Sequence, residues 1–189
     1  MTNSNEQKFS VMLADIKADE GNYDAFIKEP LVYLQKHGVD LVAQEDLTPP
    51  GASVLANSAA TDRGVSLHAA LAESEQLTVS WDWWGVTFTM NDTLCKDIAG
   101  GGATMATLSG LAGTVITNAG LVTGGLATVA GAAIAAVLII KAAEITLVNN
   151  GNGVYFPISW VQWAPIIAMG GVTGPALIAA AALIHPIRL

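Results

Sequence analysis

The chain has 189 residues, of which 52% are hydrophobic and only 13% are charged, and its formal net charge is −8. All but one of the 16 acidic side chains lie before residue 98, and beyond that point the charged residues are Lys141, Glu144 and Arg188. No basic patch is present to neutralise phosphates, so nucleic acid is not expected as a partner. The charge distribution predicts an acidic N-terminal half joined to a half apolar enough to enter a bilayer.

Residues 1–41 are expected to form an acidic helical module. Apolar side chains recur at helical spacing in 9–16 and again in 23–36, with the polar break Asp19-Glu20-Gly21-Asn22 between them. Gly38 follows the second run, where a glycine commonly ends a helix. The pattern predicts a helical hairpin with a small core.

Residues 25–41 read AFIKEPLVYLQKHGVDL, with a phenylalanine, an acidic residue before proline, a leucine and a Gly-Val-Asp-Leu ending. With this run, the segment 9–41 resembles the nitrile-hydratase-like leader segments of bacterial ribosomally made peptides, the precursors of bacteriocins. The resemblance implies a bacterial protein whose first segment is read by export or processing machinery, with the remainder as cargo. The chain departs from the pattern after Leu41, where no Gly-Gly cleavage site follows.

Residues 42–76 are expected to form a linker with one short helix. Thr48-Pro49-Pro50-Gly51 interrupts regular structure, and the stretch 57–64 is small and polar. A short helix is expected within Ser66–Glu75. This segment is the expected boundary between the leader-like module and a second module over 77–189.

Residues 77–90, LTVSWDWWGVTFTM, carry the clearest strand signal, because apolar and polar side chains alternate. The apolar phase changes at Gly85, which predicts a β-bulge. A second strand pair is expected over 145–148 and 154–156, joined by Asn149-Asn150-Gly151-Asn152-Gly153, with glycines where positive φ is needed. We expect 77–90 to pair with this hairpin and form a small antiparallel sheet.

The five tryptophans flank the long apolar run in two clusters, and two interpretations of them stay open. They could form the core of the small sheet, or they could form an interfacial belt whose indole rings lie at the level of lipid headgroups. The residues concerned are Trp81, Trp83, Trp84, Trp160 and Trp163.

No charged side chain occurs from Ile98 to Ile140, a run long enough for two helices of about 20 residues each. The sequence predicts a helical hairpin over 98–143 that turns near Asn118–Gly120, followed by a C-terminal apolar segment over 158–189. Small residues at four-residue spacing favour close helix packing, as they do in lipid. The residues expected to mediate insertion and helix packing are Gly113, Gly120, Gly124, Gly131 and Ala132.

No catalytic, cofactor-binding or metal-binding motif is recognisable, so an enzyme is not expected. The fold class expected is α+β, mainly α. The leading hypothesis is a membrane-active, bacteriocin-like or pore-forming protein that acts on a lipid bilayer as a homo-oligomer. It is expected in the membrane or secreted without a Sec signal peptide, since the N-terminus lacks a basic stretch followed by an apolar one. The alternatives are a constitutive small membrane protein, holin-like or scaffold, and a soluble self-assembling protein.

Overall fold

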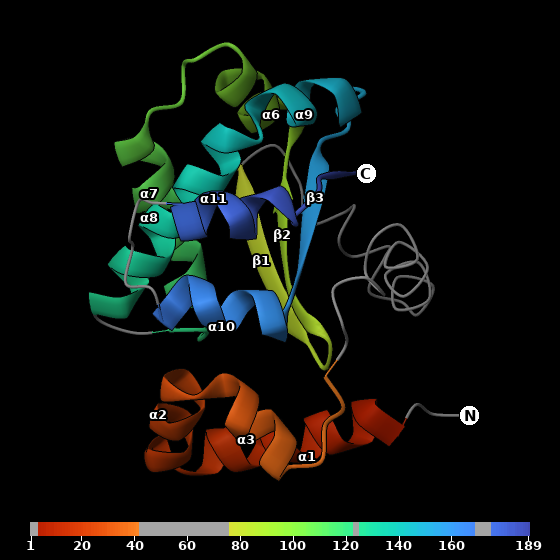
Figure 1. Ribbon diagram of the computed structural model, residues 1–189, viewed down its shortest axis with the longest axis vertical. Coiled ribbons are helices and arrows are strands. Elements are labelled where there is room, and N and C mark those ends of the chain that lie inside the picture. Colours follow the sequence, from red (N-terminus) through yellow and green to blue (C-terminus); the bar gives the residue numbers. More distant parts are fainter. Residues whose placement is uncertain (1–3, 42–75, 123–124, 169–174) are drawn as a thin grey trace.

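A computed structural model describes residues 4–41, 76–122, 125–168 and 175–189. Most of the described chain is helical, and it contains an antiparallel sheet of order β1-β2-β3-β4 (Figure 1). The expected class, α+β and mainly α, is confirmed. The strands are β1 (Leu77–Asp82), β2 (Gly85–Met90), β3 (Val154–Ser159) and β4 (Ile187–Arg188).

The N-terminal segment forms three helices, α1 (Ser4–Ala18), α2 (Glu20–Lys28) and α3 (Pro30–Lys36), rather than the two expected. The expected second helix is divided at Pro30, which has no N–H to donate and which begins a new helix well. Gly38 ends α3 with φ +70°, and the N–H of Val39 donates to the carbonyl of Leu34. The helix-ending glycine expected at this position is confirmed.

The phase change at Gly85 marks a turn between two strands, so the expected β-bulge is wrong. β1 and β2 pair antiparallel with Asp82 opposite Gly85, which leaves Trp83 and Trp84 as the two turn residues. Gly85 lies so close to β3 that a Cβ atom would meet the carbonyl oxygen of Ile158 at 2.1 Å. The glycine is therefore required by the neighbouring strand.

β2 pairs with β3, as expected, but the second strand of the expected hairpin is wrong because residues 145–148 belong to helix α9 (Ala142–Val148). Helix α9 starts immediately after helix α8 (Gly125–Ile140). Its β-branched residues are therefore helical, because the tertiary context overrides their weak preference against helix. The segment from Asn149 to Gly153 joins α9 to β3, and Gly151 and Gly153 have φ of 98° and 99°.

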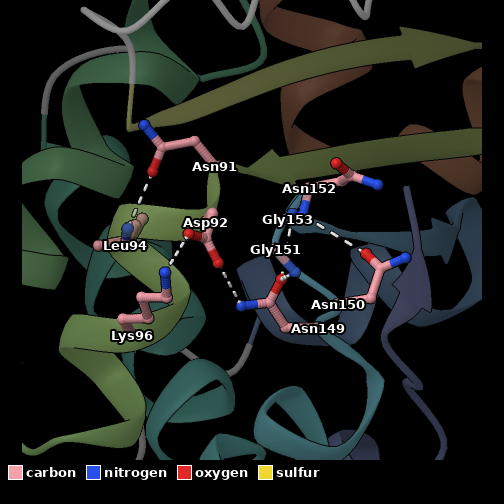
Figure 2. A network of polar contacts seen from close by, with 9 residues as sticks. All are labelled: Asn91, Asp92, Leu94, Lys96, Asn149, Asn150, Gly151, Asn152 and Gly153. Atoms are coloured by element: carbon pink, nitrogen blue, oxygen red, sulfur yellow. Dashed lines mark hydrogen bonds and ion pairs between the residues drawn. The ribbon is translucent and has the colours of Figure 1, made fainter.

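A network of polar contacts fixes this segment (Figure 2). The side-chain oxygen of Asn149 accepts from the backbone N–H groups of Gly151 and Gly153, both at 3.1 Å. Its side-chain nitrogen donates to Asp92 at 2.8 Å, and Asp92 also pairs with Lys96. These hydrogen bonds from Lys96 and Asn149 lower the pKa of Asp92. The network ties the start of β3 to helix α6 (Asp92–Ala99).

The run from Ile98 is helical, with different boundaries from those expected. Helix α6 ends before Gly101, whose φ is +74°, and helix α7 (Met105–Asn118) begins with a capping box made by Thr104 and Thr107. Helix α8 follows and packs antiparallel to α7 as a hairpin. The expected helical hairpin turning near Asn118–Gly120 is confirmed in this form.

The described part of the C-terminal apolar segment contributes to four elements. Ser159 ends β3, helix α10 (Trp160–Ala168) follows directly, and helix α11 (Pro175–Ala182) leads to β4. The linker and the short helix expected over 42–75 lie outside the described residues. The division into modules 1–41, 42–76 and 77–189 therefore stays a prediction.

A single hydrophobic core extends from the N-terminal helices through the sheet to helix α8. Figure 1 shows α1, α2 and α3 at one end of the molecule, next to α10 and to the end of the sheet where β1 turns into β2. Helix α10 packs against α3 and α8, and so connects the N-terminal helices with the hairpin.

Cys95 is buried on α6, and burial raises the pKa of its thiol to about 11. Because the thiolate is the reactive form, we expect no labelling by an aromatic disulfide reagent at pH 8 in the native protein, and complete labelling after unfolding in urea. The rate of labelling measures this. Rapid labelling of the native protein would mean that α6 opens readily.

Candidate functional site

Helices α7 and α8, here called the apolar hairpin, meet through backbone rather than through large side chains. A Cβ atom on Gly131 would lie 2.5 Å from the carbonyl oxygen of Ser109 and 2.7 Å from the backbone nitrogen of Gly113. A Cβ on Gly113 would lie 3.2 Å from the carbonyl oxygen of Ala127. Gly113 and Gly131, both expected to mediate helix packing, are therefore brought together at the point of closest approach.

Gly120, also expected to pack, does not share this role. Gly120 has φ +70° and open space around its Cα, so it ends α7 instead of contacting another helix. Its assignment as a packing residue is corrected on that ground. Ala132 lies half-buried on α8, and Gly124 lies outside the described residues.

Two exposed threonine side chains of α7 donate to carbonyl groups of their own helix. Thr114 donates to the carbonyl of Gly110 and Thr117 donates to the carbonyl of Gly113, each at 2.8 Å. Both threonines are exposed, yet neither hydroxyl requires water as an acceptor. The hairpin thus has no charged side chain, and the hydroxyl groups of Thr114 and Thr117 already donate within α7.

A charge cluster, defined here as Lys141, Glu144 and His185, lies where α8 ends. Lys141 Nζ is 2.8 Å from Glu144 Oε2, and His185 Nδ1 is 2.7 Å from Glu144 Oε1. The side chain of Lys141 is only 9% exposed, so Glu144 is its counterion in a place of low polarity. The cluster joins the bend between α8 and α9 to the segment that follows α11.

Two opposing effects act on Glu144. Partial burial raises its pKa, but the hydrogen bonds from Lys141 and His185, together with their charges, outweigh burial and lower the pKa below its ordinary value. Ionised Glu144 therefore stabilises the folded state above the pKa of the unfolded chain, and this contribution is lost as pH falls through the lower, folded-state pKa.

The tryptophans occupy two kinds of position. Trp84, Trp160 and Trp163 are buried, while Trp81 and Trp83 are partly exposed. Trp163 packs on Phe88 with ring centroids 5.8 Å apart, and Trp160 donates its indole N–H to the carbonyl of Asp82 at 3.0 Å. The sheet-core interpretation describes the three buried residues in this conformation. An interfacial belt stays a prediction for a membrane-bound form.

No helix in the described part of the chain is by itself long and apolar enough to cross a membrane, although α8 and α9, bent by 63°, pass together by length and composition. The described residues contain no cluster of three or more side chains suited to hold a metal ion. Comparison with protein-family models, curated proteins and solved structures finds no match to this chain.

Sequence reasoning missed the charge cluster. Lys141 and Glu144 are three residues apart, a spacing that favours an ion pair on a helix. His185 carried no comparable signal, because only the packing of α11 against α8 brings the C-terminal segment to Glu144.

We expect Gly131→Ala to destabilise the protein by about 1–3 kcal/mol, because the added methyl group would overlap backbone atoms of α7 that cannot turn away. Gly110→Ala is the matched control in the same hairpin, since open space surrounds Gly110. This control should be neutral or stabilising by up to about 1 kcal/mol. Urea unfolding measures both free energies, and equal values for the two variants would contradict the close contact.

Glu144→Gln should lower the free energy of unfolding at pH 7, because Lys141 would stay buried without its counterion. The difference from the wild type should shrink as pH falls through the lowered, folded-state pKa of Glu144, because the wild-type carboxylate then becomes protonated as well. Asp97→Asn, at an exposed position on α6, serves as the control. A difference that is the same at pH 7 and pH 3 would show that the ion pairs contribute nothing.

Proposed function

We propose that the protein is membrane-active and that the apolar hairpin leaves its packed position and enters a lipid bilayer, as in a bacteriocin-like or pore-forming protein. The observation that carries the proposal is the construction of the hairpin. Its helices approach each other through Gly113 and Gly131, and no described residue of α7 or α8 is charged.

Each of these features suits lipid for a physical reason. Between helices in a bilayer there is no hydrophobic driving force, so association depends on close van der Waals packing, which glycine permits. A hydroxyl group without a partner is costly in hydrocarbon, but Thr114 and Thr117 already donate within α7. The hairpin could therefore enter lipid with its internal contacts intact.

Helix length limits how the hairpin would insert. Helix α8 has 16 residues, or about 24 Å, against a hydrocarbon thickness of about 30 Å. The uncharged run continues on the N-terminal side of α7 as far as Ile98, which supplies further apolar length. The end of α8 lies on the same side of an antiparallel hairpin, and there the charge cluster would remain at the level of the headgroups, where Lys141 has water and phosphate as partners.

Exposed apolar side chains support a bilayer, or further copies of the chain, as the partner. Leu147 on α9 is 82% exposed and Ile178 on α11 is 60% exposed. The large exposed apolar residues of the second half include Met105, Leu126, Ile139, Ile140, Leu147, Val161, Ile178 and Leu183. The same exposed side chains favour the second candidate, a self-assembling protein that buries them between subunits. The proposed pore-forming species is a homo-oligomer.

Ala132→Asp tests the proposal by dye release from vesicles of phosphatidylcholine and phosphatidylglycerol. A charge near the centre of an inserting helix costs about 2.5–3.5 kcal/mol, so partitioning should fall roughly 100-fold and leakage with it. Ala132→Ser is the matched control of similar size, and it should leak like the wild type. Thr93→Asp, exposed on α6 outside the hairpin, controls for charge alone.

Folding is checked by the helical circular dichroism and the melting temperature of each variant. If Ala132→Asp does not fold, Thr128→Asp places the charge on the exposed side of the same helix. Undiminished leakage by folded Ala132→Asp, or by folded Thr128→Asp, would contradict insertion of the hairpin. Large particles in water without any leakage would favour the self-assembling alternative, and wild-type protein found only in the membrane of its producer would favour a constitutive membrane protein.

A further inference from the structure

The N-terminal helices contact the rest of the molecule through an aromatic cluster. The ring of Phe26 lies 5.7 Å from that of Trp81 and 5.4 Å from that of Trp160, measured between centroids. The ring of Phe9 lies 6.2 Å from Trp81 and 6.4 Å from Trp160. Two phenylalanines from the N-terminal helices thus cover two tryptophans that belong to the sheet and to α10.

The residues on each side of this contact also interact with one another. The ion pairs Lys8–Asp40 and His37–Asp15 join residues of the N-terminal segment to one another. On the other side, the indole N–H of Trp160 donates to the carbonyl of Asp82, and the rings of Trp81 and Trp160 pack edge to face at 6.1 Å. The two tryptophans are therefore held in place by contacts that do not involve the N-terminal helices.

We infer that residues 4–41 are a releasable cover on a tryptophan surface, formed by Trp81 and Trp160, that docks into the headgroup region of a bilayer before the hairpin inserts. The inference rests on the proposed function and adds the surface that first touches the membrane. Indole rings favour the headgroup level because one part of the ring system is apolar and its N–H is polar.

The negative charge of the cover disfavours its approach to an anionic membrane. Acidic side chains outnumber basic ones in residues 4–41, so the covered molecule presents negative charge at this end to an anionic surface. Trp83, in the turn that follows β1, is already partly exposed. Removing the cover would expose Trp81 and Trp160 as well and take negative charge away.

Helix α10 provides a physical connection from this surface to the hairpin. It begins at Trp160 and packs against both α3 and α8. Docking of the tryptophan surface would therefore bring lipid next to a helix that holds α8 in place. The order of events is release of the cover, docking of the tryptophans, and then insertion.

The double variant Phe9→Ala/Phe26→Ala, in the full-length chain, tests the cover. Its binding to phosphatidylcholine–phosphatidylglycerol vesicles should be roughly tenfold tighter or more, because apparent affinity scales with the fraction of molecules in the uncovered state. Val11→Ala/Val32→Ala is the matched control, since both valines are exposed on the same N-terminal segment, 61% and 58%. Co-sedimentation with the vesicles measures binding, and protection of the Phe88 amide from hydrogen exchange verifies that the sheet is folded.

Adding Trp81→Phe to the uncovered variant should reverse most of the gain, whereas adding Trp163→Phe should not, because the ring of Trp163 packs on Phe88 rather than on Phe9 or Phe26. If the double variant does not fold, Phe26→Leu alone gives a smaller change in the same direction. Wild-type leakage with no gain in binding for either variant would overturn the cover and leave the proposed function standing. No binding or leakage by any variant, the wild type included, would overturn both.

Discussion

The contact on which the structure depends is the backbone approach between Gly113 and Gly131. With any side chain at Gly131, α8 would be pushed away from α7, because the atoms it would meet are backbone atoms of the neighbouring helix. Most of α8 is buried, and it also packs against α10 and α11. A displacement of α8 would therefore disturb the helices that connect it to the sheet and to the N-terminal segment.

The same contact matters both for packing in the folded protein and for the proposed insertion into lipid. The glycines reduce the intrinsic preference of both helices for helical structure by about 1 kcal/mol each relative to alanine. In the folded protein, the van der Waals packing of α7 against α8 at this contact offsets the lost helix propensity. In lipid, the same close contact would hold the two helices together without large side chains.

The charge cluster and the aromatic cluster lie in different parts of the molecule and are physically different. Lys141, Glu144 and His185 respond to pH, because the strength of their contact depends on ionised Glu144. Phe9, Phe26, Trp81 and Trp160 carry no charge, so their contact depends on packing alone. Of these two contacts, the charge cluster is therefore the one that depends on pH, through ionised Glu144, whereas a lipid surface would act at the aromatic rings.

Local patterns in the sequence determined the helical hairpin, the pairing of 77–90 with 154–156, the glycine that ends α3 and the packing glycines Gly113 and Gly131. The helices and the helix-ending glycine depend on side-chain period and backbone freedom at glycine, which are local. The strand pairing is predicted because strand patterns lie directly before and after the apolar run, and the packing glycines are predicted by small-residue spacing. The sequence misled at Gly85, because a turn and a bulge produce the same change of apolar phase. It also misled at 145–148, where continuation from α8 overrides a β-branched composition.

Only the tertiary structure decided which distant residues meet. His185 reaches Glu144 because α11 packs on α8. Phe26, on α2, reaches Trp160 because α2 packs on α3 and α3 packs on α10. Neither pair is separated by a helical or strand period, so no local pattern could indicate it. The sequence by itself determined most of the described helices and strands, the segment 145–148 excepted, and where helices can approach closely. The placement of charges and aromatic rings against one another depends on how those segments pack, because packing alone fixes distances between residues far apart in the chain.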